Sequence, residues 1–60
     1  MKHRDPQQAF KDAINNGYFN DWDDLAENWV GNFMYMGTTE DDRDAFKNCD
    51  TRAYVYVPIF

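Results

Sequence analysis

The eleven aromatic side chains of this 60-residue chain constrain its fold more than any other feature. A domain of this size buries only roughly 60% of the surface that its unfolded chain exposes. Cys49 is the single cysteine, so no disulfide within the chain can reinforce the fold. Aromatic side chains, each burying roughly 150–250 Å², must therefore supply much of the core. We expect one compact domain over residues 1–60, with residues 1–4 frayed.

The first predicted element is an amphipathic helix that begins after Asp5 and ends at Gly17. Asp5 is a suitable N-cap and Pro6 suits the first helical position. Gln8 stands three residues after the cap, where it can complete a capping box. Between these ends, four apolar residues recur at helical spacing and form one stripe: Ala9, Phe10, Ala13 and Ile14.

The next segment predicts a second amphipathic helix. Asn20 or Asp21 can cap it, and Gly31 can supply a left-handed exit. Its apolar residues follow the i, i+3, i+4, i+7, i+8 pattern of a helix face: Trp22, Leu25, Ala26, Trp29 and Val30. We therefore expect both tryptophans to lie in the core and the acidic residues between them to lie outside.

The rest of the chain predicts two strands with a short helix between them. Residues 33–36 form a short unbroken apolar run that contains two aromatic residues, and residues 52–57 are rich in β-branched and aromatic side chains. Thr38 or Thr39, followed by three acidic residues, indicates the start of a short helix. The inner edge of that helix would be Ala45, Phe46 and Cys49. The predicted fold is α+β, with two N-terminal amphipathic helices packed on a small two-stranded sheet, whose pairing direction stays open.

Negative charge is concentrated in the middle of the chain. Ten of the eleven carboxylates lie between Asp12 and Asp50, where the cations are Arg43 and Lys47, so this segment has a formal charge of −8. Two clusters stand at predicted helix starts: Asp21, Asp23, Asp24 and Glu27, and Glu40, Asp41, Asp42 and Asp44. Such residues can serve as helix caps and as a solvated surface. A dense field of one sign also attracts a cationic partner, and carboxylates along a helix can imitate nucleic-acid phosphates.

Metal sites and catalytic sites have little support in the sequence. Asp21-Trp22-Asp23 and Asp42-Arg43-Asp44 begin like calcium loops but do not continue with the glycine and the glutamate of such loops. One cysteine and one histidine, His3, cannot assemble a zinc site or a nucleophile with its base. We therefore expect no metal, no cofactor and no enzyme activity.

Tyrosine and methionine side chains form a second candidate surface. In a half-buried strand, Tyr54 and Tyr56 share one face. With Tyr35, Met34 and Met36 they could bind a partner, or they could line the edge of the core with their hydroxyls in water. If these side chains bind a partner, the chain would be a small protein–protein adapter or regulatory subunit. The net charge of −5 disfavours direct binding of nucleic acid through the tyrosines.

In overall character, this small, acidic, aromatic-rich chain resembles the small phage-encoded inhibitors of bacterial defence, including anti-CRISPR proteins that imitate DNA. The resemblance implies a binding inhibitor whose acidic clusters occupy a cationic nucleic-acid-binding groove of a host complex, such as a CRISPR effector. The implied partner is a basic host protein or nucleoprotein complex. The first residues lack the apolar run of a signal peptide, and no apolar stretch in the sequence is long enough to span a bilayer. We expect a cytoplasmic location in the host cell, no membrane partner, and a monomer or weak dimer.

Overall fold

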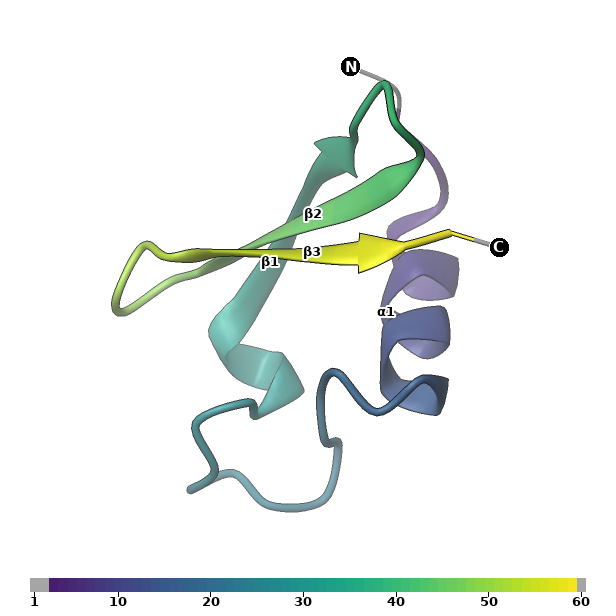
Figure 1. Ribbon diagram of the computed structural model, residues 1–60. Helices are drawn as coiled ribbons and strands as arrows, with labels where there is room; N and C mark the ends of the chain where they lie inside the picture. The colour runs from purple at the N-terminus through teal and green to yellow at the C-terminus, as the bar shows by residue number, and fades with distance from the viewer. Residues whose placement is uncertain (1–2, 60) are drawn as a thin grey trace.

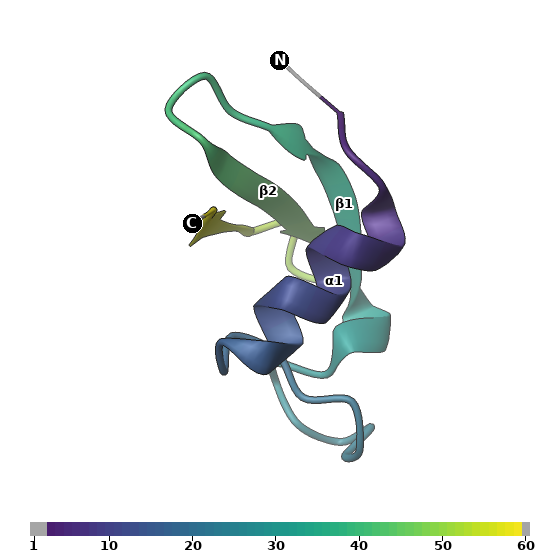
Figure 2. The same cartoon turned by 90° about the vertical axis from the view of Figure 1, so that its right-hand side faces the viewer.

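The computed structural model describes residues 3–59 and places one α-helix against a three-stranded sheet (Figure 1). Helix α1 spans Pro6–Asn15, and a short 3₁₀ helix, η1, spans Val30–Asn32. The strands are β1 (Phe33–Thr38), β2 (Arg43–Asn48) and β3 (Tyr54–Pro58), which pair antiparallel in the order β1-β2-β3. Helix α1 lies across one face of this sheet (Figure 2). The broad α+β class is confirmed, but the predicted arrangement of two helices on a two-stranded sheet is wrong.

Helix α1 begins where the sequence predicts. The Asp5 carboxylate accepts a hydrogen bond from the backbone N–H of Gln7 at 3.0 Å, and Pro6 lies in the first turn. Gln8, which was expected to complete a capping box, instead donates its side-chain amide to Asp12 at 2.9 Å. The chain turns away after the helix at Gly17, whose φ of +83° lies in the left-handed region that favours glycine.

The predicted second helix is wrong: residues 20–29, named the acidic loop below, contain turns in its place. The backbone N–H of Asn20 donates to the carbonyl of Asn28 at 3.1 Å, and their side chains are joined at 2.6 Å, which closes the neck of the loop. Asn20 Oδ1 also accepts from the N–H of Asp23, and Asp23 Oδ1 accepts from the N–H of Leu25. These side chains offer the backbone an alternative to helical hydrogen bonds, and here the alternative wins over the apolar periodicity.

Gly31 also has a different role from the predicted helix exit. It lies inside η1, and a Cβ added at this position would be 2.3 Å from Nε1 of Trp29. The indole ring therefore packs directly over the glycine, and any larger residue would have to displace it.

The predicted third helix is strand β2. Residues 39–42 form a turn in which the N–H of Thr39 donates to the carbonyl of Arg43 at 2.8 Å, and Asp42 has a φ of +60°. A threonine followed by acidic residues suits a helix start and a turn alike. Strand β2 is stabilised by pairing with β1 on one side and β3 on the other, and neither partner is visible in a local sequence window. The two predicted strands themselves are confirmed, with ends shifted by one or two residues.

The core lies between α1 and the inner face of the sheet. Its buried hydrophobic cluster consists of Ala9, Ala13, Phe19, Phe46 and Val57. The ring of Phe46 is fully buried, and its centroid lies 4.9 Å from that of Phe10 and 5.0 Å from that of Phe19. Ala9 and Ala13 let α1 approach the sheet closely, as the apolar stripe of the helix predicts.

Candidate partner-binding surfaces

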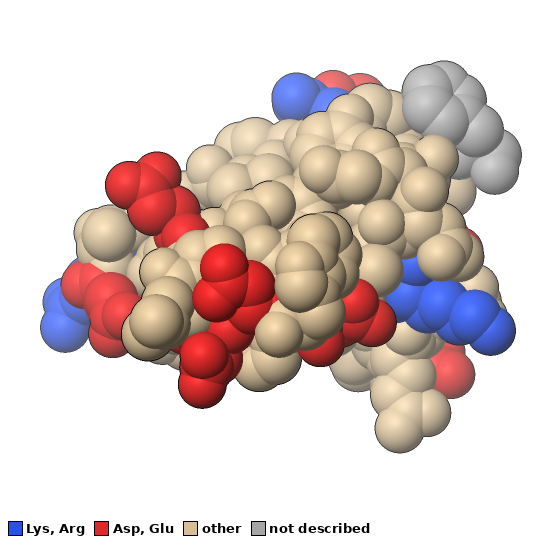
Figure 3. Space-filling model, turned by 90° about the horizontal axis from the view of Figure 1, so that it is seen from below, with Lys and Arg blue, Asp and Glu red and all other residues tan. Residues whose placement is uncertain are grey.

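The acidic loop projects from one end of the molecule and carries the first predicted acidic cluster. Its four carboxylates are all exposed, and the loop contains no cation: Asp21, Asp23, Asp24 and Glu27. Figure 3 looks at this end of the molecule and shows carboxylates gathered across it, with basic side chains towards the margins. Because the hydrogen bonds of Asn20 and Asn28 fix the neck of the loop, this charge has a defined place in the fold.

Two large apolar side chains stand among these carboxylates. Trp22 is 79% exposed and Leu25 is 91% exposed, although the sequence pattern predicts both in the core. That part of the prediction is wrong because it needs a helix that does not form. Exposed apolar side chains enclosed by charged residues are typical of a surface that a partner covers.

A shallow hollow borders the acidic loop. Its volume is about 460 Å³, and it is lined by Asp21 from the loop and by five residues of α1: Gln7, Phe10, Lys11, Ile14 and Asn15. Phe10 and Ile14 are half-buried and give the hollow an apolar floor. The hollow therefore offers partly apolar surface beside the loop.

The second predicted cluster does not join the first. Glu40, Asp41 and Asp42 lie in the turn between β1 and β2, at the end of the molecule opposite the acidic loop in both views (Figures 1 and 2). Asp41 is also paired with Arg43 at 2.9 Å. Hydrogen bonding from Thr39 and from Arg43 holds the pKa of Asp41 below its ordinary value. The two clusters thus form separate anionic surfaces.

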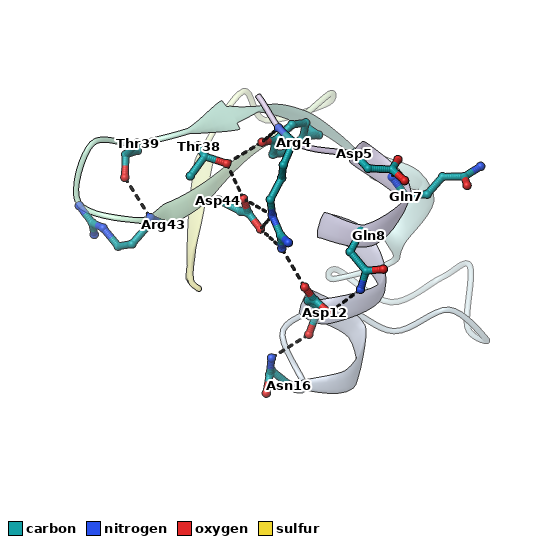
Figure 4. A network of polar contacts seen from close by, with 11 residues as sticks. Arg4, Asp5, Gln7, Gln8, Asp12, Asn16, Thr38, Thr39, Arg43 and Asp44 are labelled. Atoms are coloured by element: carbon teal, nitrogen blue, oxygen red, sulfur yellow. Dashed lines mark hydrogen bonds and ion pairs between the residues drawn. The ribbon is translucent and has the colours of Figure 1, made fainter. Parts of the chain in front are cut away.

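Asp44, the fourth member of the second cluster, is buried, with 1% of its surface exposed. Its carboxylate accepts from Nε of Arg4 at 3.0 and 3.1 Å, from Nη2 of Arg4 at 2.6 Å, and from the Thr38 hydroxyl at 2.8 Å (Figure 4). Asp44 is therefore a structural residue. Arg4, which was expected to be frayed, is held on the sheet, while residues 1 and 2 lie outside the described range.

The guanidinium of Arg4 bridges the sheet and α1. Its Nη2 also lies 2.9 Å from Asp12, and the hydrogen bonds to Asp44 and Asp12 outweigh partial burial and raise the pKa of Arg4. Hydrogen bonds from Arg4 and Gln8 in turn lower the pKa of Asp12. Tyr35 belongs to the same network, because its hydroxyl accepts from the Arg4 backbone N–H at 3.1 Å and lies 2.6 Å from the Thr38 hydroxyl. Tyr35 is thus separated from the other tyrosines of the predicted surface.

The face of the sheet opposite α1 carries the rest of that predicted surface and is named the tyrosine face below. Strand alternation and register place its residues together: Met34, Arg43, Ala45, Lys47, Tyr54 and Tyr56. Met34, Tyr54 and Tyr56 are between 44% and 49% exposed. The tyrosine rings are stacked with centroids 6.1 Å apart, and Met36 lies in the bulge of β1 between Tyr35 and Gly37.

Two cations that sequence reasoning left out of this surface lie over the tyrosine rings. The guanidinium carbon of Arg43 is 4.9 Å from the ring centroid of Tyr56, and Nζ of Lys47 is 5.9 Å from that of Tyr54. Their spacing of four residues places both on one face of a strand, so a strand prediction for β2 would have found them. The tyrosine face is therefore aromatic and cationic, whereas the acidic loop is aromatic and anionic.

Comparisons of the chain with protein-family models, with characterised proteins and with solved structures found no significant match. Within residues 3–59, no group of three His, Cys, Asp or Glu side chains is placed to hold a metal ion. In the same range, no helix has both the length and the hydrophobicity needed to cross a bilayer.

Proposed function

We propose that this protein is an acidic binding inhibitor that docks its acidic loop in a cationic nucleic-acid-binding groove of a host complex. The observation that carries the proposal is the composition of the loop surface, where four exposed carboxylates flank the exposed Trp22 and Leu25 along the chain. A groove that holds nucleic acid offers basic side chains for the phosphates, and a groove that holds unpaired bases also offers aromatic surfaces on which they stack. The loop presents complements to both.

The loop supplies steering and anchoring through different side chains. Its carboxylates would accelerate encounter with a basic groove and give the association its salt dependence. Trp22 and Leu25 would supply affinity, because tryptophan is enriched among interface residues that dominate binding energy, and full burial of a leucine contributes about 1.5–3 kcal/mol. One anionic end of the molecule is enough for this mode of binding, so the separate position of Glu40, Asp41 and Asp42 does not oppose it.

A capture experiment with immobilised protein and bacterial lysate tests this proposal. We expect a nucleic-acid-binding protein or complex to be retained at low salt, and excess duplex DNA to displace it. Asp23→Asn/Asp24→Asn should reduce capture and make the remainder less sensitive to salt. Trp22→Ala should weaken binding about 30-fold, which corresponds to a loss of about 2 kcal/mol at an anchor residue. Capture that duplex DNA leaves unchanged would contradict the proposed groove.

The matched control neutralises charge at the other end of the molecule. Glu40→Gln/Asp42→Asn removes as many negative charges as the loop variant, and it should retain most of the captured partner. If the two variants behave alike, net charge and not the acidic loop governs binding, and the proposed site is wrong.

An adapter that binds through the tyrosine face remains a second candidate, favoured by the exposure of Met34, Tyr54 and Tyr56. On this alternative, Tyr54→Ser/Tyr56→Ser would abolish capture, whereas substitutions in the acidic loop would not. Tyr35 drops out of the alternative, because its hydroxyl is engaged with Arg4 and Thr38. The same capture experiment, repeated with the serine variant, separates the two functions.

A further inference from the structure

The chain carries two exposed aromatic surfaces of opposite charge. The acidic loop presents Trp22 and Leu25 among four carboxylates. The tyrosine face presents the stacked rings of Tyr54 and Tyr56 together with Lys47 and Arg43. By register no acidic residue of the three strands lies on that face, while Asp41 of the turn between β1 and β2 is paired with Arg43. The two surfaces are complementary in charge. Each also exposes apolar side chains whose burial against a partner would be favourable.

The two surfaces of one chain do not cover each other. Trp22 and Leu25 are 79% and 91% exposed, so neither packs on the tyrosine face of its own copy. The bonds between Asn20 and Asn28 hold the loop beyond the end of the sheet (Figures 1 and 2). Contact between these surfaces therefore needs a second molecule.

We propose that the acidic loop of one copy docks on the tyrosine face of another copy. In this arrangement, the carboxylates of the loop face Lys47 and Arg43, and the indole of Trp22 lies against the tyrosine rings. Two tyrosine faces packed on each other would bring like charges together, so a loop-to-face contact is favoured over a symmetric face-to-face dimer. The contact is head-to-tail: in a dimer, one copy has an unoccupied loop and the other has an unoccupied tyrosine face. Further copies can add to these ends unless the copies form a closed ring.

The small size of the molecule limits the strength of this association. A standard interface buries about 800 Å² on each partner, which is about a fifth of the 4209 Å² surface of the described chain. One ten-residue loop covers less than that. Arg43 also forms an ion pair with Asp41, whose carboxylate oxygen lies 2.9 Å from the Arg43 guanidinium. Lys47 therefore attracts the carboxylates of the loop more strongly than Arg43 does. The expected self-association is weak, is promoted by low salt, and competes with binding of any other partner to the loop.

Sedimentation velocity over a range of protein concentrations up to about 1 mM tests the proposal, because dissociation constants of this order mark weak interfaces. At low salt, the weight-average sedimentation coefficient should rise with protein concentration above that of the 7.2 kDa monomer. It should return to the monomer value at about 0.3 M salt, where charges are screened over less than about 8 Å. A monomer at every concentration in low salt would overturn the proposal.

Charge reversal identifies the surfaces involved. Lys47→Glu should weaken self-association at least tenfold, and so should Asp23→Lys/Asp24→Lys. An equimolar mixture of these two variants should associate again, because each variant then meets a surface of opposite charge. Glu40→Lys is the matched control, since it reverses a charge in the turn between β1 and β2, outside both surfaces, and should leave self-association unchanged. Circular dichroism of each variant establishes that it is folded.

Other results would assign the tyrosine face differently. If folded Lys47→Glu protein associates as the unaltered protein does, or if the mixture of variants stays monomeric, the loop-to-face contact is wrong. A third pattern of results would point to nucleic acid: an oligothymidine binds the unaltered protein, Lys47→Glu abolishes this binding, and the protein alone stays monomeric. In that case the tyrosine face binds single-stranded nucleic acid and not a second copy. This inference does not depend on the proposed host partner, because Lys47→Glu should leave capture of that partner by the loop intact.

Discussion

Replacing Asp44 by asparagine should strongly destabilise the fold, although it removes a single charge from an acidic chain. Asparagine nearly preserves the volume of the side chain but leaves the guanidinium of Arg4 without its main counter-charge. Removal of one partner from a buried ion pair costs about 3–5 kcal/mol. The side chain of Arg4 keeps 28% of its exposure, so water can solvate part of the charge, and we expect a loss near the lower limit, about 3 kcal/mol.

A loss of this size is large for so small a domain. A chain of 60 residues has a free energy of unfolding of about 3–9 kcal/mol, so the variant would lose a third of its stability or more. Urea unfolding followed by far-UV circular dichroism measures the effect as a lower transition midpoint at an unchanged slope. Asp24→Asn is the matched control: it removes the same charge from an exposed position and should change the free energy of unfolding by less than about 0.5 kcal/mol.

A double-variant cycle then isolates the ion pair. Arg4→Met alone should also destabilise the fold, because it leaves the Asp44 carboxylate buried without a cation. The two substitutions together should cost less than the sum of their separate effects by about 1–3 kcal/mol, since each removes the same interaction. If Asp44→Asn is as stable as Asp24→Asn, or if the two effects simply add, the network around Arg4 does not hold the N-terminal segment on the sheet.

Three further predictions concern the pH dependence of stability, the packing of Trp29 and the exposure of Trp22. The free energy of unfolding should fall as the pH is lowered from about 4, because the folded state depresses the pKa of Asp12 and of Asp41. The stability that these two carboxylates contribute is lost as they become protonated. An acid titration followed by circular dichroism would show no such fall if the ion pairs Arg4–Asp12 and Arg43–Asp41 do not form. Gly31→Ala should displace the indole of Trp29, whose Nε1 would lie 2.3 Å from the new Cβ, and an unchanged tryptophan emission spectrum would contradict this contact. Trp22→Ala should leave the free energy of unfolding, measured by urea unfolding, within about 0.5 kcal/mol of that of the unaltered protein, and a larger loss would place this side chain in the core.

The elements that sequence reasoning predicted correctly are those whose signals are local. Asp5 and Pro6 mark the start of α1 independently of the rest of the fold, and β3 is rich in residues that favour strands. Strand β2 lacks such a signal, because Thr39 and the acidic residues after it are equally compatible with the start of a helix. The strand is stabilised by β1 and β3 on its two sides, and that information is not local.

The candidate surfaces show the same division. The four acidic residues of the loop were predicted to be exposed, and they are, because a solvated carboxylate needs no particular fold. The spacing of Trp22 and Leu25 matches a helix face and so predicts that both lie in the core. Asn20 and Asp23 prevent that helix through local hydrogen bonds, and both side chains are exposed. Asp44 was expected at the surface, whereas its partner Arg4 lies 40 positions earlier in the chain, a separation that sequence patterns do not resolve.

Photocrosslinking in bacterial lysate tests most directly whether the acidic loop is the surface that meets a partner. A photoreactive phenylalanine derivative placed at position 22, which keeps an aromatic side chain at the anchor, should form a crosslink to a nucleic-acid-binding protein, and excess duplex DNA should suppress it. The same residue at position 40, in the turn at the opposite end of the molecule, should give little or none. A partner that is captured by position 40 and not by position 22 would show that the loop is not the binding site.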